Sequence, residues 1–387
     1  MTGPPKSKVS LPQDITRPML RQKDSDGFFL FYNGGLRAIE AGENAWFIEP
    51  VFDGGPCAKG AMSRSDAHTF LQQSGFRPIA FQSVFWRNGV YGSGWSPIVT
   101  GRSDHMIAPA DIWSQIAGNL ATGRMAGRFE RDATPSRDEV GKTVDARDEA
   151  ERLALSISLS LRNMDISIEQ ITEFYQEQLA NLMASGTLDG RRTGTIADSM
   201  LYAHVHGFFT HLGAARDYLA TLVASRRGMN TEKINSMSWL FEKLRLDDMG
   251  DDQILTVLVK RGYVGKKATS AAKAVPAGWL EEMTELRNIL MHRRPYGDRF
   301  TEQRGYAVAA DRQNGIYRYV RPFLMPDGSE ADVLDLALHH YHEACGLFLE
   351  CAEISGYDTG IRIITDADII SAKITDIASD LPSNPRT

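Results

Sequence analysis

The strongest constraint on the fold is a change in the spacing of apolar residues near residue 146. Beyond this point they recur at intervals of three and four, which places them on one face of an α-helix. The clearest case is residues 196–223, where the spacing joins Phe208, His211, Ala215, Leu219 and Leu222. Because such faces must be buried against one another, the pattern predicts a bundle of packed helices in the C-terminal half.

The same spacing predicts further helices at residues 149–163, 167–183, 232–246, 252–261, 278–294 and 330–355. Ser167 and Gln170 fit a capping box at the start of the second of these. Pro295 limits the fifth, because the residue before a proline avoids the helical conformation. Residues 262–274, which include Lys266 and Lys267, are expected to form a loop, and residues 317–324 a strand pair.

The N-terminal region has a different pattern of apolar residues. Short aromatic and β-branched runs predict strands at Phe28–Tyr32, Ala45–Val51 and Ile79–Trp86. The pair Asn88-Gly89 favours a hairpin turn, because both residues tolerate positive φ. Short helices are expected at residues 65–73 and 109–120, and the second has a proline at its first position.

Together these patterns predict an α+β protein, with an N-terminal mixed β-rich domain followed by a C-terminal all-helical bundle. The expected parts, in chain order, are a mobile arm (1–26), a mixed α/β domain of unknown role (27–121), a polar linker (122–145), connecting helices (146–192), the bundle (193–357) and a tail (358–387). The linker is predicted from its glycine, arginine and aspartate content.

Composition excludes several classes of protein. The chain begins without an apolar signal-peptide core and has no run of about 18 apolar residues, which favours a cytoplasmic protein without a membrane segment. Its three cysteines, Cys57, Cys345 and Cys351, argue against a disulfide framework and a zinc knuckle. The net charge of −6 counts against a general nucleic-acid binder, although a local basic patch can outweigh the total.

Chemistry concentrates in Glu281–Pro295, which reads EEMTELRNILMHRRP. Arg287 is a permanent cation with a fixed fork of donors that suits a phosphate. His292 can exchange a proton near neutral pH, and the dipole at a helix C-terminus favours its protonated form. Five positions of ideal helix rotate by roughly 500°, so the two side chains do not lie in one line. They converge only if the helix end loosens or a second copy completes the site.

The order Arg-Asn-x3-His, at the end of a helix in a small helical bundle, resembles the HEPN superfamily. It is also similar to the nuclease halves of RNA-targeting CRISPR effectors. The likeness covers about residues 193–357 and leaves residues 1–145 without a resemblance. It implies a metal-independent, cofactor-free endoribonuclease that uses the RNA 2′-hydroxyl as nucleophile, leaves a 2′,3′-cyclic phosphate and works as a homodimer. A toxin or phage-defence effector, with an antitoxin or regulatory protein as partner, fits this class.

Carried over to this chain, the resemblance implies that Arg287 stabilises the charge of the phosphorane and that His292 moves the proton. Asn288 would orient the phosphate or the histidine, and Asp217 on the preceding long helix is a candidate supporting residue. The nearby basic residues Arg293, Arg294, Arg299, Lys266 and Lys267 are candidate contacts for the RNA backbone. They could equally form a solvated face beside Glu281, Glu282 and Glu285.

A competing reading is a catalytically inactive HEPN-like module that binds RNA, a nucleotide or a protein partner, which the acidic pI favours. A separate alternative is that Arg287 and His292 only cap helix carbonyls. Two histidine clusters could supply metal ligands, but we interpret them as residues of the helix seams: His204, His206, His211 and His339, His340, His342. Four tryptophans are expected in the core, with a ligand surface as the alternative: Trp46, Trp86, Trp95 and Trp113. The glycine-rich segments that begin at Asp53 and Tyr91 are expected to be turns.

Overall fold

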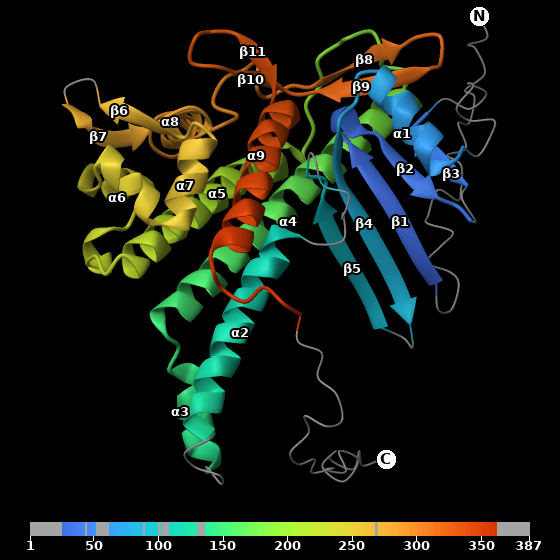
Figure 1. Ribbon diagram of the computed structural model, residues 1–387. Coiled ribbons are helices and arrows are strands. Elements are labelled where there is room, and N and C mark those ends of the chain that lie inside the picture. The colour runs from blue at the N-terminus through green and yellow to red at the C-terminus, as the bar shows by residue number, and fades with distance from the viewer. Residues whose placement is uncertain are drawn as a thin grey trace, which may run out of the picture.

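A computed structural model describes residues 25–42, 45–51, 62–87, 90–99, 102, 108–129, 136–267 and 270–361. The protein is α+β: an antiparallel sheet comes first in the chain and long helices follow (Figure 1). The expected N-terminal arm lies outside the described residues, apart from its last two positions, which begin a strand. The expected tail and the turn at Asp53 also fall outside them, apart from residues 358–361.

The sheet has five antiparallel strands in the order β3-β2-β1-β4-β5. Their bounds are β1 Ser25–Tyr32, β2 Arg37–Glu40, β3 Trp46–Glu49, β4 Pro78–Arg87 and β5 Val90–Pro97. The three predicted strands are confirmed as parts of β1, β3 and β4. Helix α1, Arg64–Gln73, follows the third strand and is capped by Ser63, whose hydroxyl accepts the Asp66 amide.

Strands β4 and β5 form the predicted hairpin, since their register closes at the pair Arg87 and Val90. The turn residues Asn88 and Gly89 lie outside the described residues. The segment Tyr91–Trp95, which was expected to be a turn, belongs to β5 instead. Its glycines are tolerated there because Gly92 gives room to the ring of Phe85 on the paired strand, which would collide with a Cβ at that position.

Eight further helices are described. Their bounds are α2 Pro109–Phe129, α3 Arg137–Asp145, α4 Glu149–Ala184, α5 Asp198–Arg226, α6 Met237–Lys243, α7 Gln253–Lys260, α8 Trp279–His292 and α9 Val333–Ile354. Short 3-10 turns occur at η2 Asn33–Gly35, η4 Thr231–Lys233 and η5 Leu246–Asp251. Helix α4 is the central element, because it packs against α5 and α2 and also against η2 beside the sheet (Figure 1).

Two predictions in this region were wrong. The expected linker is largely helical: α2 continues to Phe129, and α3 opens with a capping box of Ser136 and Glu139. A tertiary contact holds this segment against the helices, because Arg124 Nε of α2 lies 2.9 Å from the carboxylate of Glu151 on α4. Glu151 is buried. The helix break expected at Ser167 is also absent: α4 is one helix of 36 residues, and the Ser167 hydroxyl donates to the Asn163 carbonyl inside it.

The C-terminal half is not all-helical, which corrects a further prediction. Three two-stranded sheets connect its helices. They consist of β6 Val264–Lys267 with β7 Ser270–Pro276, β8 Tyr306–Asp311 with β9 Ile316–Val320, and β10 Pro322–Leu324 with β11 Glu330–Asp332. The loop expected at residues 262–274 is thus a hairpin. The strand pair expected at 317–324 is two strands that pair with other partners.

One contiguous cluster of buried apolar residues extends from β1 to α9, so the sheet and the helices share a core. Trp113 illustrates the connection, since it is fully buried and its indole donates to the Phe348 carbonyl of α9 at 3.0 Å. Within the described residues, no helix is long and apolar enough to cross a membrane.

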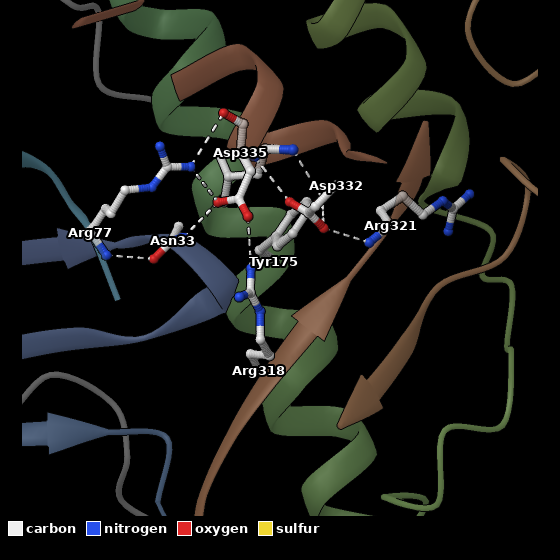
Figure 2. Close-up of polar contacts among 8 residues, drawn as sticks. Asn33, Arg77, Tyr175, Arg318, Arg321, Asp332 and Asp335 are labelled. Carbon is white, nitrogen blue, oxygen red and sulfur yellow. Dashed lines mark hydrogen bonds and ion pairs between the residues drawn. The ribbon is translucent and has the colours of Figure 1, made fainter. Parts of the chain in front are cut away.

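A polar network, which we call the junction, ties the sheet to the helices (Figure 2). It is formed by Asn33, Arg77, Tyr175, Arg318, Arg321, Asp332 and Asp335. The carboxylate of Asp335 on α9 forms ion pairs with the guanidinium groups of Arg77 at 3.0 Å and Arg318 at 2.9 Å. Asp332 caps α9 and accepts the Tyr175 hydroxyl at 3.0 Å and the Arg321 amide at 2.9 Å. The junction therefore joins β4, α4, β9 and the start of α9.

Candidate functional site

Helix α8 carries the sequence motif and has one buried face. Leu280, Met283, Leu286 and Leu290 are buried at the three- and four-residue spacing of a helix. The helix ends at His292, three residues before the proline that was expected to limit it: the amides of Arg293 and Arg294 both bond to the Ile289 carbonyl. The remaining faces of α8 are available for α5 and for solvent.

Helices α5 and α8 meet in an antiparallel contact, which we call the α5–α8 seam. Arg216 donates to the Thr284 hydroxyl at 2.6 Å, and the Thr210 hydroxyl lies 3.2 Å from the Met291 sulfur. Beyond the end of α8, the Tyr296 amide donates to His206 Nε2 at 3.1 Å. These α5 contacts, with Gly213 between them, recur at three- and four-residue intervals, so one stripe of α5 follows α8 from Thr284 to beyond its C-terminal end.

Arg287 lies in the middle of this seam, against Gly213. A Cβ at Gly213 would stand 3.2 Å from Arg287 Nε, so the glycine lets the guanidinium approach the α5 backbone. Arg287 Nε is buried and has no hydrogen-bond partner. The one polar contact of this side chain among the described residues is a long hydrogen bond of 3.4 Å from Nη1 to Asn288 Oδ1. No carboxylate of the described chain lies within ion-pair distance of Arg287.

This absence distinguishes Arg287 from Arg216 and Arg294, the other arginines near α8 that are at least partly buried. Arg216 pairs with Asp217 at 2.8 Å, and Arg294 lies 3.5 Å from the fully buried Glu302. A partly desolvated cation without a counter-charge is costly to the folded state, and so is a buried donor without an acceptor. An external anion bound at the accessible end of the Arg287 guanidinium would supply the missing counter-charge.

His292 is exposed and, in the part of the chain that the structure describes, makes no hydrogen bond or ion pair. Asn288 is also exposed. On a regular helix, five positions correspond to a rise of about 7.5 Å and a rotation of roughly 500°. Arg287 and His292 therefore emerge from different sides of α8, and one copy of the chain does not bring them together.

Asp217, the candidate supporting residue, is occupied elsewhere. Its carboxylate accepts Arg216 Nε at 2.9 Å and the Met237 amide at 3.2 Å. No hydrogen bond or ion pair joins it to Arg287 or His292. Its contact with the site is indirect, because Arg216 also donates to Thr284 of α8. Sequence reasoning overlooked Arg216, Thr284 and Gly213, although the spacing of Thr210, Gly213 and Arg216 on α5 is a signal for this stripe.

The five basic residues predicted to contact RNA divide into two groups at opposite ends of α8. Lys266 and Lys267 are exposed on β6, where they line a shallow pocket of about 300 Å³ with Thr284 and Glu285. Arg293 and Arg299 are exposed near the other end. Arg294 is engaged within the fold, since it pairs with Glu302 and donates to the Leu324 carbonyl.

At least one histidine of each cluster has a structural partner. His340 is buried and accepts the Trp279 indole N–H at 2.9 Å, and burial lowers its pKa to about 3. His206 accepts the Tyr296 amide, and burial lowers its pKa as well. Among the described residues, no group of three or more His, Cys, Asp or Glu is arranged to hold a metal ion. Trp46 and Trp113 are buried in the core, and Trp95 donates to the Tyr341 hydroxyl.

No family model matches the chain, and comparisons with curated proteins and with solved structures found no match either. The residues of the α5–α8 seam are therefore the basis for assigning a function.

Proposed function

We propose that the protein is a metal-independent endoribonuclease of the HEPN type. The observation that carries the proposal is Arg287: it is half-buried, without a carboxylate in the described chain, and its Nε lacks a partner. A guanidinium held in this state against α5 is prepared for a phosphate, which it can bind through two parallel N–H bonds. Asn288 and His292 on the same helix supply a second polar contact and a proton carrier.

The chemistry follows from these groups. The RNA 2′-hydroxyl loses its proton to solvent as its oxygen attacks the adjacent phosphorus, and the bond from phosphorus to the 5′-oxygen breaks. Arg287 would stabilise the charge that develops on the phosphorane oxygens, and His292 would give a proton to the departing 5′-oxygen. The products are a 2′,3′-cyclic phosphate and a 5′-hydroxyl. DNA lacks the attacking hydroxyl and would not be cut.

The site requires two copies of the chain in this proposal. Because Arg287 and His292 emerge from different sides of α8, a two-fold homodimer would combine Arg287 of one copy with His292 of the other. The exposed basic residues Lys266, Lys267, Arg293 and Arg299 would then extend the phosphate-binding surface. A toxin or defence effector in the cytoplasm, controlled by an antitoxin or regulatory protein, is the role we attach to this activity.

A second candidate is a non-catalytic HEPN-like module that binds RNA or a protein. Two observations favour it: the net charge is −6, and Asp217 is engaged by Arg216 instead of by the motif. Binding without cleavage would need Arg287 but not His292.

The test is cleavage of a labelled single-stranded RNA by purified protein in excess EDTA, with a DNA strand of the same sequence as control. We expect cyclic-phosphate ends, and rates lower by about 10²–10³ in Arg287→Ala and His292→Ala. Arg152→Ala and His339→Ala alter an exposed arginine and an exposed histidine elsewhere and should cut normally. Binding without cleavage, or equal cutting by the two motif variants, would leave the second candidate.

The composite site has its own test. If Arg287→Ala and His292→Ala proteins are mixed and allowed to exchange subunits, about half of the dimers are mixed, and each mixed dimer has one intact site of two. The mixture should therefore recover about a quarter of the wild-type rate. A mixture that stays as inactive as its two components contradicts the pairing across the dimer.

A further inference from the structure

A cavity of about 700 Å³ lies beside the junction, far along the chain from the α8 motif. Its walls come from α1, the start of β4, the segment after β5 and α9. In the part of the wall that the structure describes, the permanently charged residues are all arginines: Arg64, Arg77 and Arg102. Two histidines, His68 and His342, also face it, and among the described residues no aspartate or glutamate lines it. The cavity therefore favours an anion.

Arg64 is the most available of these cations. Arg77 and Arg102 each have a carboxylate partner, Asp335 and Glu353. Arg64 has none within ion-pair distance in the described chain, and its guanidinium lies over the ring of Phe81 at 5.4 Å from the centroid. Stacking on a ring fixes the plane of a guanidinium and leaves its N–H edge for a ligand. A phosphate is the anion that matches such a fork.

His342 contributes an unused hydrogen-bonding atom. Its Nε2 is buried and has no partner. Burial is the main reason that the pKa of His342 is lowered to about 4, assisted by the charge of Arg77 and opposed by a backbone hydrogen bond at Ile79. The ring is thus neutral, and Nε2 can then accept a hydrogen bond. A buried acceptor without a donor indicates a missing partner.

The rest of the wall is apolar. Leu30, Ile98 and Val99 line the cavity, which suits the faces of a flat ring. Ligand sites in this size range combine such a wall with a few fixed polar groups. We propose that the cavity binds a phosphorylated nucleoside, with the phosphate at Arg64, the ring against the apolar wall and a ligand N–H or O–H donated to His342 Nε2. This site is independent of the α8 motif.

The experiment is calorimetric titration of the full-length protein with AMP, with adenosine, inorganic phosphate and decanoate as separate arms. We expect AMP to bind more tightly than each of the other three. Arg64→Ala should weaken AMP about tenfold or more, as expected for the loss of one charge-assisted contact. Arg64 is exposed, so this variant should fold, and Arg152→Ala is the matched control.

A second variant separates the two ends of the ligand. His342→Phe keeps a ring in the wall and removes the acceptor, so it should weaken AMP while leaving inorganic phosphate unchanged. The proposal is overturned if wild-type protein shows no heat with millimolar AMP, or if Arg64→Ala binds AMP as well as wild type. It is also overturned if phosphate alone binds as tightly as AMP, or if decanoate binds more tightly.

Discussion

The junction and the α5–α8 seam both hold arginines between elements that are distant in the sequence. They differ in whether a carboxylate of the chain neutralises the guanidinium. In the junction each guanidinium has a carboxylate: Arg77 and Arg318 share Asp335 (Figure 2). Arg321 pairs with Asp198 at 3.0 Å. In the seam, Arg287 has none in the described chain. Arginines that hold the fold are neutralised within it, so an arginine left without a counter-charge points to a partner outside the fold.

Removing one arginine from each region should give the largest contrast in stability. Arg321 is fully buried and also donates to the Tyr202 hydroxyl, so Arg321→Met leaves Asp198 buried and unpaired. We expect a loss of about 3–5 kcal/mol in the free energy of unfolding. Arg287→Met loses no ion pair and removes an unpartnered donor, so its cost should be below about 1 kcal/mol. Urea denaturation measures both.

The same two variants can break the comparison. If Arg287→Met destabilises the protein as much as Arg321→Met does, Arg287 holds the fold, and its lack of a counter-charge says nothing about a ligand. Arg318→Met provides an intermediate reference, because Arg318 is partly exposed and its Nε also lacks a partner while its Nη2 is paired with Asp335.

The described chain also holds the opposite case to Arg287, a buried carboxyl group that lacks a cationic partner. From it we predict that the stability of the protein depends on pH. Asp165 of α4 is buried, accepts the Tyr341 hydroxyl at 2.6 Å, and has its pKa raised to about 7, chiefly by burial. Burial also raises the pKa of Glu169 to about 7. The folded state then binds more protons than the unfolded state at mildly acid pH. Stability is therefore greatest at low pH for these groups and falls as pH rises from about 4 to about 7.

The measurement is the urea midpoint at several pH values. Asp165→Asn keeps an acceptor for Tyr341 and cannot ionise. Between pH 5 and 7 its free energy of unfolding should therefore fall less than that of wild type, and the difference between the two losses should be up to about 2–3 kcal/mol. Asp189→Asn, an exposed aspartate of the same type, should follow the wild-type curve. Parallel curves for wild type and Asp165→Asn would show that Asp165 does not carry the effect.

The smallest expected effect concerns the position of Arg287. Gly213 is helical, so Gly213→Ala should stabilise α5 by about 0.5–1 kcal/mol. The new methyl group would meet Arg287 Nε at 3.2 Å and displace a flexible side chain. We expect RNA cleavage to fall about tenfold, because small displacements of a catalytic group are costly. Thermal unfolding and the cleavage assay give the two readouts, and unchanged cleavage would mean that the guanidinium is not held in position by α5.

Local patterns were enough to locate most of the elements. The apolar period of three and four residues identified α5, α7, α8 and α9, because a helix that buries one face has to repeat in this way. The aromatic runs identified β1, β3 and β4 for the corresponding reason in a sheet. The position of Arg287, Asn288 and His292 on α8, and the end of that helix near Pro295, also followed from sequence alone. The errors fell on segments without a local apolar face, such as α3 and the glycine-containing β5.

What the tertiary structure decided is the partner of each charged side chain. Arg77 meets Asp335 across 258 positions of chain, and Arg124 meets Glu151 only because α2 packs on α4. Asp217 forms an ion pair with the adjacent Arg216. Arg287 instead lies against Gly213, where no carboxylate of the described chain pairs with it. Sequence determines which residues can carry charge and on which helix face they lie. Whether a charge is neutralised depends on elements that folding brings together, and sequence separation carries little information about that, since closing a longer loop costs only slightly more.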